Sequence, residues 1–324
     1  MKMEERPWAD LQFDLLSIIS NQLGLIDLLS FRAVCNHWRS ASSQASAEIE
    51  SSKAQLWFLL YGETAQCCFL TYAGRYRIEI PEMFESTCLA SFVGWLLLYR
   101  KNSNSLFFFC PFSRAKIEIP PCPLILEQSQ SESDLYAAFS YYPTDPDCTL
   151  VVVIKRKNDA KMKLCMLHRG EYEWTFHEHI ASDQFVGQIS SVAFQERAFH
   201  FWDEYSERVV VFQYDTMTWV NYFVIHGEQQ EIAASITLDY RVKAEANEEI
   251  FSSKRVEMKQ LLGIDHHDLC SISICGATSD AKHHGTSHEF LEEEEDIANK
   301  PRREFKGVWL QPRFYQISED QQRW

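Results

Sequence analysis

The sequence has no apolar run long enough to cross a membrane. Its longest apolar stretches, 92–99 and 106–110, are far shorter than the roughly 20 residues that a membrane-spanning helix needs. The opening residues, Met-Lys-Met-Glu-Glu-Arg-Pro, place no apolar core behind a basic start, so we expect no secretory signal. These absences predict a soluble protein of the cytoplasm, the nucleus or both.

Positive charge is also scarce. Lys and Arg total 31 against 46 Asp and Glu, which gives a formal net charge of −15. This balance argues against a surface for nucleic acid or for an anionic membrane, since both attract basic proteins. We therefore expect neither partner.

Catalytic and metal-binding motifs are lacking as well. The eleven glycines are isolated, and the sequence contains no G-x-S-x-G, H-E-x-x-H or kinase motif. The ten cysteines include no C-x-x-C pair and are expected to be reduced and buried. One group has the spacing H-H-x2-C-x4-C-x7-H-H, which fits no zinc template: His266, His267, Cys270, Cys275, His283 and His284. We predict no catalytic residue, no metal site and no cofactor.

What the sequence does contain is enough apolar material for a large core. Hydrophobic residues make up 46% of the 324 residues and aromatic residues 14%, so global disorder is excluded. The length suits two domains. A Ser- and Ala-rich segment, 40–52, separates a part with helical spacing from a much longer part with the pattern of strands.

The first forty residues have helical spacing. Leu15, Ile19 and Leu23 follow one another at intervals of four, which predicts an amphipathic helix. Gly24 is placed to end this helix in a left-handed conformation, and Asp27 to cap the start of a second one. A third short helix is expected after it. Three short helices cannot bury so much apolar surface alone, so they need a partner or the rest of the chain.

The same segment resembles an F-box. The family pattern opens with Leu-Pro-x-Glu-Leu-Leu, has a central Asp-Leu, and closes with Val-Cys-x-x-Trp-Arg. This sequence follows the pattern almost throughout, in order and spacing, but has Gln12 in place of the family proline. The resemblance implies a contact with a Skp-family adaptor, formed or supported by Leu11, Gln12, Leu15, Leu16, Ile18, Ile19, Leu23, Asp27, Leu28, Leu29, Val34, Cys35 and Trp38.

An F-box implies a non-catalytic subunit of a Skp–cullin–F-box (SCF) ubiquitin ligase. The adaptor would link the chain to a cullin, and the rest of the chain would bind a target protein that the sequence does not identify. Three alternatives stay open. The helices could be a plain N-terminal cap on the β domain. The chain could be an F-box scaffold that acts outside a ligase, which the loss of proline at Gln12 would favour. It could also be a β-propeller enzyme.

Repeated strand patterns fill the remainder. The segment 75–81, R-Y-R-I-E-I-P, recurs 39 residues later at 114–120 as R-A-K-I-E-I-P, each time after an aromatic strand. Between 188 and 225 four short strands are expected, at 189–194, 198–202, 209–214 and 219–224. Four strands in about 40 residues are typical of one propeller blade.

Two turns resemble those of kelch-related propellers in plant F-box proteins. Cys110-Pro111-Phe112-Ser113 with Ile119-Pro120 is similar to an Asn-Pro-x-Thr…Leu-Pro hairpin, and the sequence from 214 to 219, Y-D-T-M-T-W, is similar to the kelch turn. The paired glycines of kelch blades are absent. We predict a mainly β fold in which a divergent kelch-like β-propeller follows a small all-α F-box.

The domain boundaries follow from these patterns. Residues 1–45 are expected to form the F-box of three short helices, 46–63 a junction, and 64–324 the propeller-like substrate-binding domain. About four blades are expected between 64 and 224. An irregular acidic loop is expected at about 280–305, and a last strand pair at 308–310 and 314–315.

Overall fold

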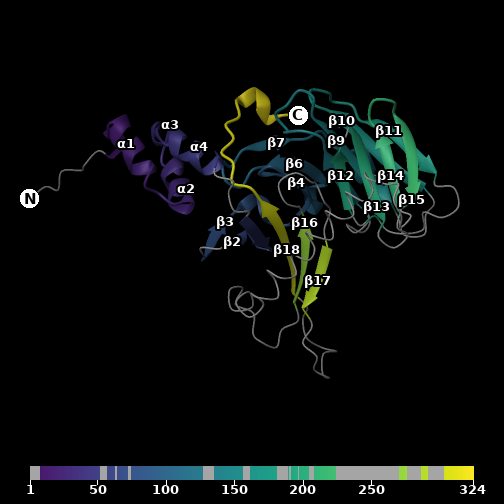
Figure 1. Cartoon of the computed structure of the whole chain (residues 1–324), viewed down its shortest axis with the longest axis horizontal. Helices are drawn as coiled ribbons and strands as arrows, with labels where there is room; N and C mark the ends of the chain where they lie inside the picture. The colour runs from purple at the N-terminus through teal and green to yellow at the C-terminus, as the bar shows by residue number, and fades with distance from the viewer. Residues whose placement is uncertain are drawn as a thin grey trace, which may run out of the picture.

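The structure is a computed structural model, in which a small group of helices precedes a series of β-sheets (Figure 1). It describes residues 8–51, 57–62, 64–71, 74–126, 135–155, 161–180, 189, 191–195, 197–203, 208–223, 270–275, 286–290 and 303–324. None of the helices in these ranges is long and apolar enough to span a membrane.

The helical part contains the three predicted helices and a fourth. The elements are η1 (Trp8–Asp10), α1 (Phe13–Ser20), α2 (Leu25–Ala33), α3 (Asn36–Ala41) and α4 (Ser43–Ser51). The prediction for Gly24 and Asp27 was wrong: Gly24 has an extended backbone (φ −68°, ψ 164°) at the N-cap of α2, and Asp27 lies in its first turn. The first helix ends earlier, at Ser20.

Helix α4 lies where the sequence suggested only the beginning of a junction. It is held by a buried cation, because the Arg32 guanidinium donates to the hydroxyls of Ser42 and Ser46 at 3.0 and 2.7 Å. Ala45 of α4 is buried too. Alanine has a high helix propensity and serine an intermediate one, so propensity permits this helix without requiring it. The packing of Arg32 and Ala45 is what stabilises α4. The segment 46–63 thus contains most of α4 and also the first strand.

The strands of the described residues form four sheets. The first has the order β17–β16–β18–β1–β2–β3, and the other three are four-stranded antiparallel sheets of consecutive strands. The bounds are β1 (Trp57–Tyr61), β2 (Gln66–Thr71), β3 (Gly74–Glu79), β4 (Ser86–Phe92), β5 (Trp95–Arg100), β6 (Ser105–Phe109), β7 (Lys116–Glu118), β8 (Leu135–Phe139), β9 (Thr149–Lys155), β10 (Lys161–His168), β11 (Thr175–Ile180), β12 (Ser191–Gln195), β13 (Ala198–Asp203), β14 (Arg208–Gln213), β15 (Thr218–Phe223), β16 (Cys270–Cys275), β17 (Thr286–Phe290) and β18 (Arg303–Leu310). The short helical elements η2 (Pro81–Met83), η3 (Lys101–Ser103), α5 (Pro123–Leu126) and η5 (Glu319–Gln322) lie between or after them.

The sheets are arranged as propeller blades. Strand β18 of the first sheet contacts β4, the first strand of the second sheet. Strand β4 in turn contacts β8, and β8 contacts β12, which are the first strands of the third and fourth sheets. Strand β9 is buried along its whole length, as expected for a strand with sheets on both sides. The predicted mainly β, blade-like fold is confirmed. The repeated segment 75–81 contains all of β3 but its first residue, and 114–120 contains β7; these are the last strands of two successive blades.

The first blade is completed by a strand from the far end of the sequence. Strand β18 pairs antiparallel with β1, from Trp57 opposite Leu310 to Tyr61 opposite Lys306. The predicted last strand pair is thus half right, since 308–310 is a strand but 314–315 is not. The predicted acidic loop at 280–305 is interrupted by β17 and reaches the start of β18, and its other residues lie outside the described ranges.

Two large buried clusters make up most of the core of the described residues. The larger one joins the first three blades to the helices, because Leu28 of α2 and Ala45 of α4 belong to it together with strand residues such as Phe108. The second fills the space between the sheets β8–β11 and β12–β15, with Phe199 and Phe212 fully buried. The helical part is therefore packed against the propeller.

Candidate functional site

Helices α1–α3 have a small core of their own and still expose a large apolar surface. Leu16, Phe31 and Ala41 are buried together, with Trp38 packed against Phe31 at 4.5 Å between ring centroids. Six apolar side chains of this part remain between 41% and 62% exposed: Trp8, Phe13, Leu15, Ile18, Ile19 and Val34. Most large apolar side chains of a soluble domain are covered, so such a group of exposed ones marks an interaction surface.

The thirteen residues predicted from the F-box pattern fall into three groups. Those exposed are Gln12, Leu15, Ile18, Ile19, Asp27 and Val34; those half-buried are Leu11, Leu23, Leu29, Cys35 and Trp38; those buried are Leu16 and Leu28. Leu16 and Leu28 have no exposed surface, so they support the helices rather than contact a partner. Trp8 and Phe13 were missed, because the pattern does not include these positions.

Polar contacts hold α1 against the end of α3. The hydroxyls of Ser17 and of the buried Ser20 both donate to the carbonyl of Ala41, at 3.0 and 3.4 Å. These bonds satisfy the polar groups on the inner face of α1. The opposite face, with Leu15 and Ile18, is left to solvent.

The segment 311–324 connects the helices to the propeller. The Arg313 guanidinium donates to the Glu50 carbonyl at 2.8 Å, and the amide of Phe314 donates to the Glu50 carboxylate. The Arg32 guanidinium lies 4.7 Å from the centre of the Phe314 ring. Burial lowers the pKa of Arg32 below its ordinary value, and the nearby Arg39 acts in the same direction. Helices α2 and α4 are thus tied to this segment.

The same segment continues over the blades. The Tyr315 hydroxyl donates to the carbonyl of Val93 at 2.6 Å, after β4. Trp324 is almost fully buried, stacks on Phe108 at 5.2 Å, and donates through its indole nitrogen to the carbonyl of His168 at 2.8 Å. The segment therefore fixes the position of the exposed helical surface relative to the second and third blades.

The structure brings together no metal ligands in the described residues. In the group considered from the sequence, Cys270 and Cys275 lie at the two ends of β16, and the four histidines lie outside the described ranges. Two histidines of β11 pack against aromatic rings: His177 against Phe212 and His179 against Trp219, both at 4.9 Å between ring centroids.

Comparison with known proteins gives two family matches. The F-box domain matches residues 8–46, which contain η1 and helices α1–α3, and the KIB1-4 beta-propeller matches residues 69–264, more than half of the chain. F-box protein At4g00893 of Arabidopsis thaliana is 30% identical over 155 residues, which cover 47% of this chain and 37% of that protein.

Two further relatives are from the same plant. F-box protein At4g12382 is 30% identical over 126 residues, covering 39% of this chain and 91% of that protein. F-box/kelch-repeat protein At1g57790 is 24% identical over 221 residues, covering 65% of this chain and 58% of that protein. The chain therefore spans less than two thirds of the length of At4g00893 and of At1g57790.

An F-box followed by a propeller is the domain arrangement of F-box substrate adaptors, which are generally non-catalytic. The helical motif and the four-stranded blades of the structure agree with both matches. On this evidence the chain belongs to the plant F-box proteins that carry a KIB1-4 β-propeller.

Proposed function

We propose that the chain is the substrate-recognition subunit of an SCF-type ubiquitin ligase, acting in the cytoplasm, the nucleus or both. Helices α1–α3 dock on a Skp-family adaptor, which in turn binds a cullin, while the propeller binds a target protein. The observation that carries the proposal is the set of apolar side chains that α1 and its neighbours leave exposed although the helices already have a core.

The role in ubiquitin transfer is one of proximity. A target held on the propeller is kept close to a ubiquitin carrier that other subunits supply, which raises the effective concentration of its lysines. Such a role needs no catalytic residue in this chain. It does need a fixed distance between the two binding surfaces, which the contacts of Arg313 and Phe314 with Glu50 favour.

The energetics suit a docking surface of this kind. Full burial of a large apolar side chain contributes roughly 1.5–3 kcal/mol, so covering side chains that are about half exposed contributes about 1 kcal/mol each. Association costs at least about 4 kcal/mol in lost freedom of motion. Loss of two central side chains should therefore remove most of the binding.

The test replaces two exposed residues of α1, Leu15→Asp with Ile18→Asp, in the full chain. Binding to a purified Skp-family adaptor should fall by more than about 100-fold, because two charges would enter an apolar contact. Leu16 is unsuitable for this test because it is fully buried, and an aspartate there would unfold the helices.

A matched control adds the same two charges elsewhere. Ser40→Asp with Ala47→Asp alters exposed positions of α3 and α4 and should leave adaptor binding unchanged. Circular dichroism should give the same melting temperature for both double variants. Equal adaptor affinity in the α1 variant and the wild type would contradict the proposed docking surface.

The scaffold alternative rests on the replacement of the family proline by Gln12, and the backbone angles of Gln12 do not support it. Gln12 has φ −60° and ψ 143°, within the range that a proline ring imposes on φ. The entry to α1 is therefore the same as with proline, and the substitution gives no reason to expect failed docking. Mass spectrometry of complexes purified through the adaptor separates the alternatives, since only the ligase subunit brings down a cullin.

A further inference from the structure

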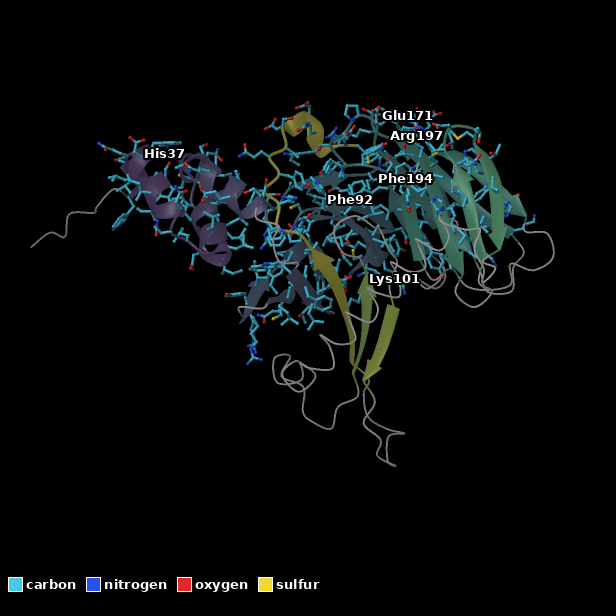
Figure 2. The ribbon with its side chains drawn as sticks, viewed as in Figure 1. His37, Phe92, Lys101, Glu171, Phe194 and Arg197 are labelled. Carbon is cyan, nitrogen blue, oxygen red and sulfur yellow. The ribbon has the colours of Figure 1, made fainter. Side chains whose placement is uncertain are left out.

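An aromatic surface lies at the ends of strands β4, β8 and β12, with its tyrosines exposed and its two phenylalanines half-buried. The rings of Phe92 and Tyr142 are 5.7 Å apart, and so are the rings of Tyr141 and Phe194. Phe92 and Phe194 belong to β4 and β12, and the two tyrosines follow β8. Figure 2 shows Phe92 and Phe194 with Arg197 and Glu171 in the upper part of the propeller. The surface thus joins three successive blades.

Two loops of the third blade extend this surface. The loop after β10 is bonded to the loop after β8, since the amide of Arg169 donates to the carbonyl of Cys148 at 2.8 Å. Tyr172 in the loop after β10 is 77% exposed, more than any other large apolar side chain of the described residues. We refer to Phe92, Tyr141, Tyr142, Tyr172 and Phe194 as the upper aromatic surface.

Carboxylates accompany these rings. Asp145 and Asp147 lie in the loop after β8, Glu171 and Glu173 flank Tyr172, and all but the half-buried Asp145 are exposed. Within the part of the chain that the structure describes, none of the four takes part in an ion pair. Their charge is therefore available to a partner.

The nearby basic side chains offset only part of this charge. Arg197 donates to both oxygens of Asp215 at 2.7–3.0 Å, so their charges cancel. Arg169 donates to the uncharged carbonyl of Gln321 at 3.1 Å and lies over the Trp324 ring, so it keeps its positive charge and offsets one of the four carboxylates. The upper aromatic surface is thus an aromatic area with an excess of negative charge.

The segment 311–324 borders this surface. Tyr315 approaches Tyr142 at 6.1 Å, and Trp324 lies under Arg169. Tyr141 and Tyr172 remain exposed beyond the segment. In Figure 1 the helices and the third and fourth blades lie at opposite ends of the molecule. A partner on the upper aromatic surface therefore leaves the helices accessible.

We propose that the upper aromatic surface binds a basic polypeptide segment of the target protein, an inference that rests on the proposed adaptor function. Lys or Arg side chains are attracted both by the faces of exposed tyrosine rings and by the surrounding carboxylates. Tyrosine suits such a surface, because it offers a large rigid area with a polar end. The same carboxylates repel an acidic partner.

The probe is a set of fluorescein-labelled twelve-residue peptides of random order in three pools. The first pool is rich in Lys and Arg, the second in Asp and Glu, and the third in Ser and Gln. Fluorescence anisotropy with the full chain should show binding of the basic pool alone, weakening as salt is raised. Binding of the acidic or neutral pool as strongly as the basic pool would overturn the proposal, as would no binding of any pool.

Variants locate the binding. Glu171→Gln with Glu173→Gln should weaken binding of the basic pool by about three- to tenfold, since each exposed ion pair contributes a small factor. Tyr172→Ala should weaken it by about threefold. The matched control, Glu48→Gln with Glu79→Gln, removes the same charge at exposed positions of α4 and β3 and should have no effect. Equal weakening in both double variants would show general attraction to an acidic protein and overturn the proposal.

Failure of this inference and failure of the proposed function give different results. The Glu171 and Glu173 variant should bind the Skp-family adaptor as the wild type does. Normal adaptor binding with no preference for the basic pool would overturn the surface alone. Peptide binding that depends on Glu171 and Glu173 in a chain that binds no adaptor would overturn the ligase role and leave the surface standing.

Discussion

Gly307 is the position at which closure of the first blade can be tested by a single methyl group. It lies in β18 opposite Leu60 of β1, and no left-handed backbone conformation requires a glycine there. What requires it is the ring of Phe58. A Cβ atom at position 307 would overlap Cζ of Phe58 and lie 2.8 and 2.9 Å from its two Cε atoms.

The clash cannot be relieved cheaply. Phe58 is 2% exposed, so its ring has no free space to enter, and the approach is far inside the normal contact distance of carbon atoms. Overpacking a core typically costs 1–3 kcal/mol, and we expect Gly307→Ala to cost about 3 kcal/mol. For a chain of this size the melting temperature should fall by roughly 4–5 °C.

A second substitution identifies the cause. Phe58→Leu alone should cost about 1–2 kcal/mol through lost ring atoms. The double variant should be more stable than Gly307→Ala alone, because the smaller side chain makes room for the methyl group. The coupling between the two positions should reach 1–2 kcal/mol.

Urea denaturation of the four purified full-length proteins, followed by circular dichroism, measures the cycle. Limited proteolysis adds a local readout, since loss of the β1–β18 pairing should open the segment 311–324 to cleavage before the rest. A free energy of unfolding within 0.5 kcal/mol of the wild type for Gly307→Ala, or purely additive effects in the double variant, would refute the contact between β18 and Phe58.

Three further results are expected. Gln12→Pro should keep the melting temperature and give an equal or lower dissociation constant for the Skp-family adaptor, because the backbone already has the φ of proline. A clearly higher dissociation constant would show that the side chain or amide of Gln12 contacts the adaptor. Trp219→Ala should lower the free energy of unfolding by about 2–4 kcal/mol in urea, since the half-buried ring packs on Phe212 at 4.8 Å, and a neutral effect would contradict this packing. Hydrogen bonds from Arg197 lower the pKa of Asp215 below the usual 3.8. Any stabilisation by this pair is therefore present above about pH 4 and lost as the pH falls through the lowered pKa. NMR titration of Arg197→Gln should show a higher pKa for Asp215, and an unchanged value would contradict the pairing.

Much of the blade structure was predictable because each blade is local in sequence. In the blade β12–β15 the four predicted strands agree with the observed ones to within two residues, since each strand pairs with the next along the chain and the turns between them are short. The turn at 214–217 is present as predicted, with Met217 at φ 53°. Strand β8 was missed, although all its residues are buried, because its sequence L-Y-A-A-F contains no β-branched residue.

The F-box pattern likewise identified the right segment, but not the role of each side chain in it. Leu15 and Leu16 are neighbours of the same type, yet one is 47% exposed and the other fully buried. Their difference follows from how α1 is rotated against Phe31 and Ala41, which is a property of the packed helices. The Gly24 prediction was wrong for a related reason, since the local signal fits either end of a helix.

The sequence by itself determined the two kinds of domain, their order and most strands, because helical and strand periodicity and short turns depend on residues close together in the chain. Only the tertiary structure decided which blade β18 completes, and how the segment 311–324 ties Glu50 to Arg313 across 263 positions. It also decided that Tyr141 and Phe194 form one surface. Contacts of this kind join residues that are far apart in the chain and share no local sequence pattern. They exist only because packing of the whole core brings these residues together.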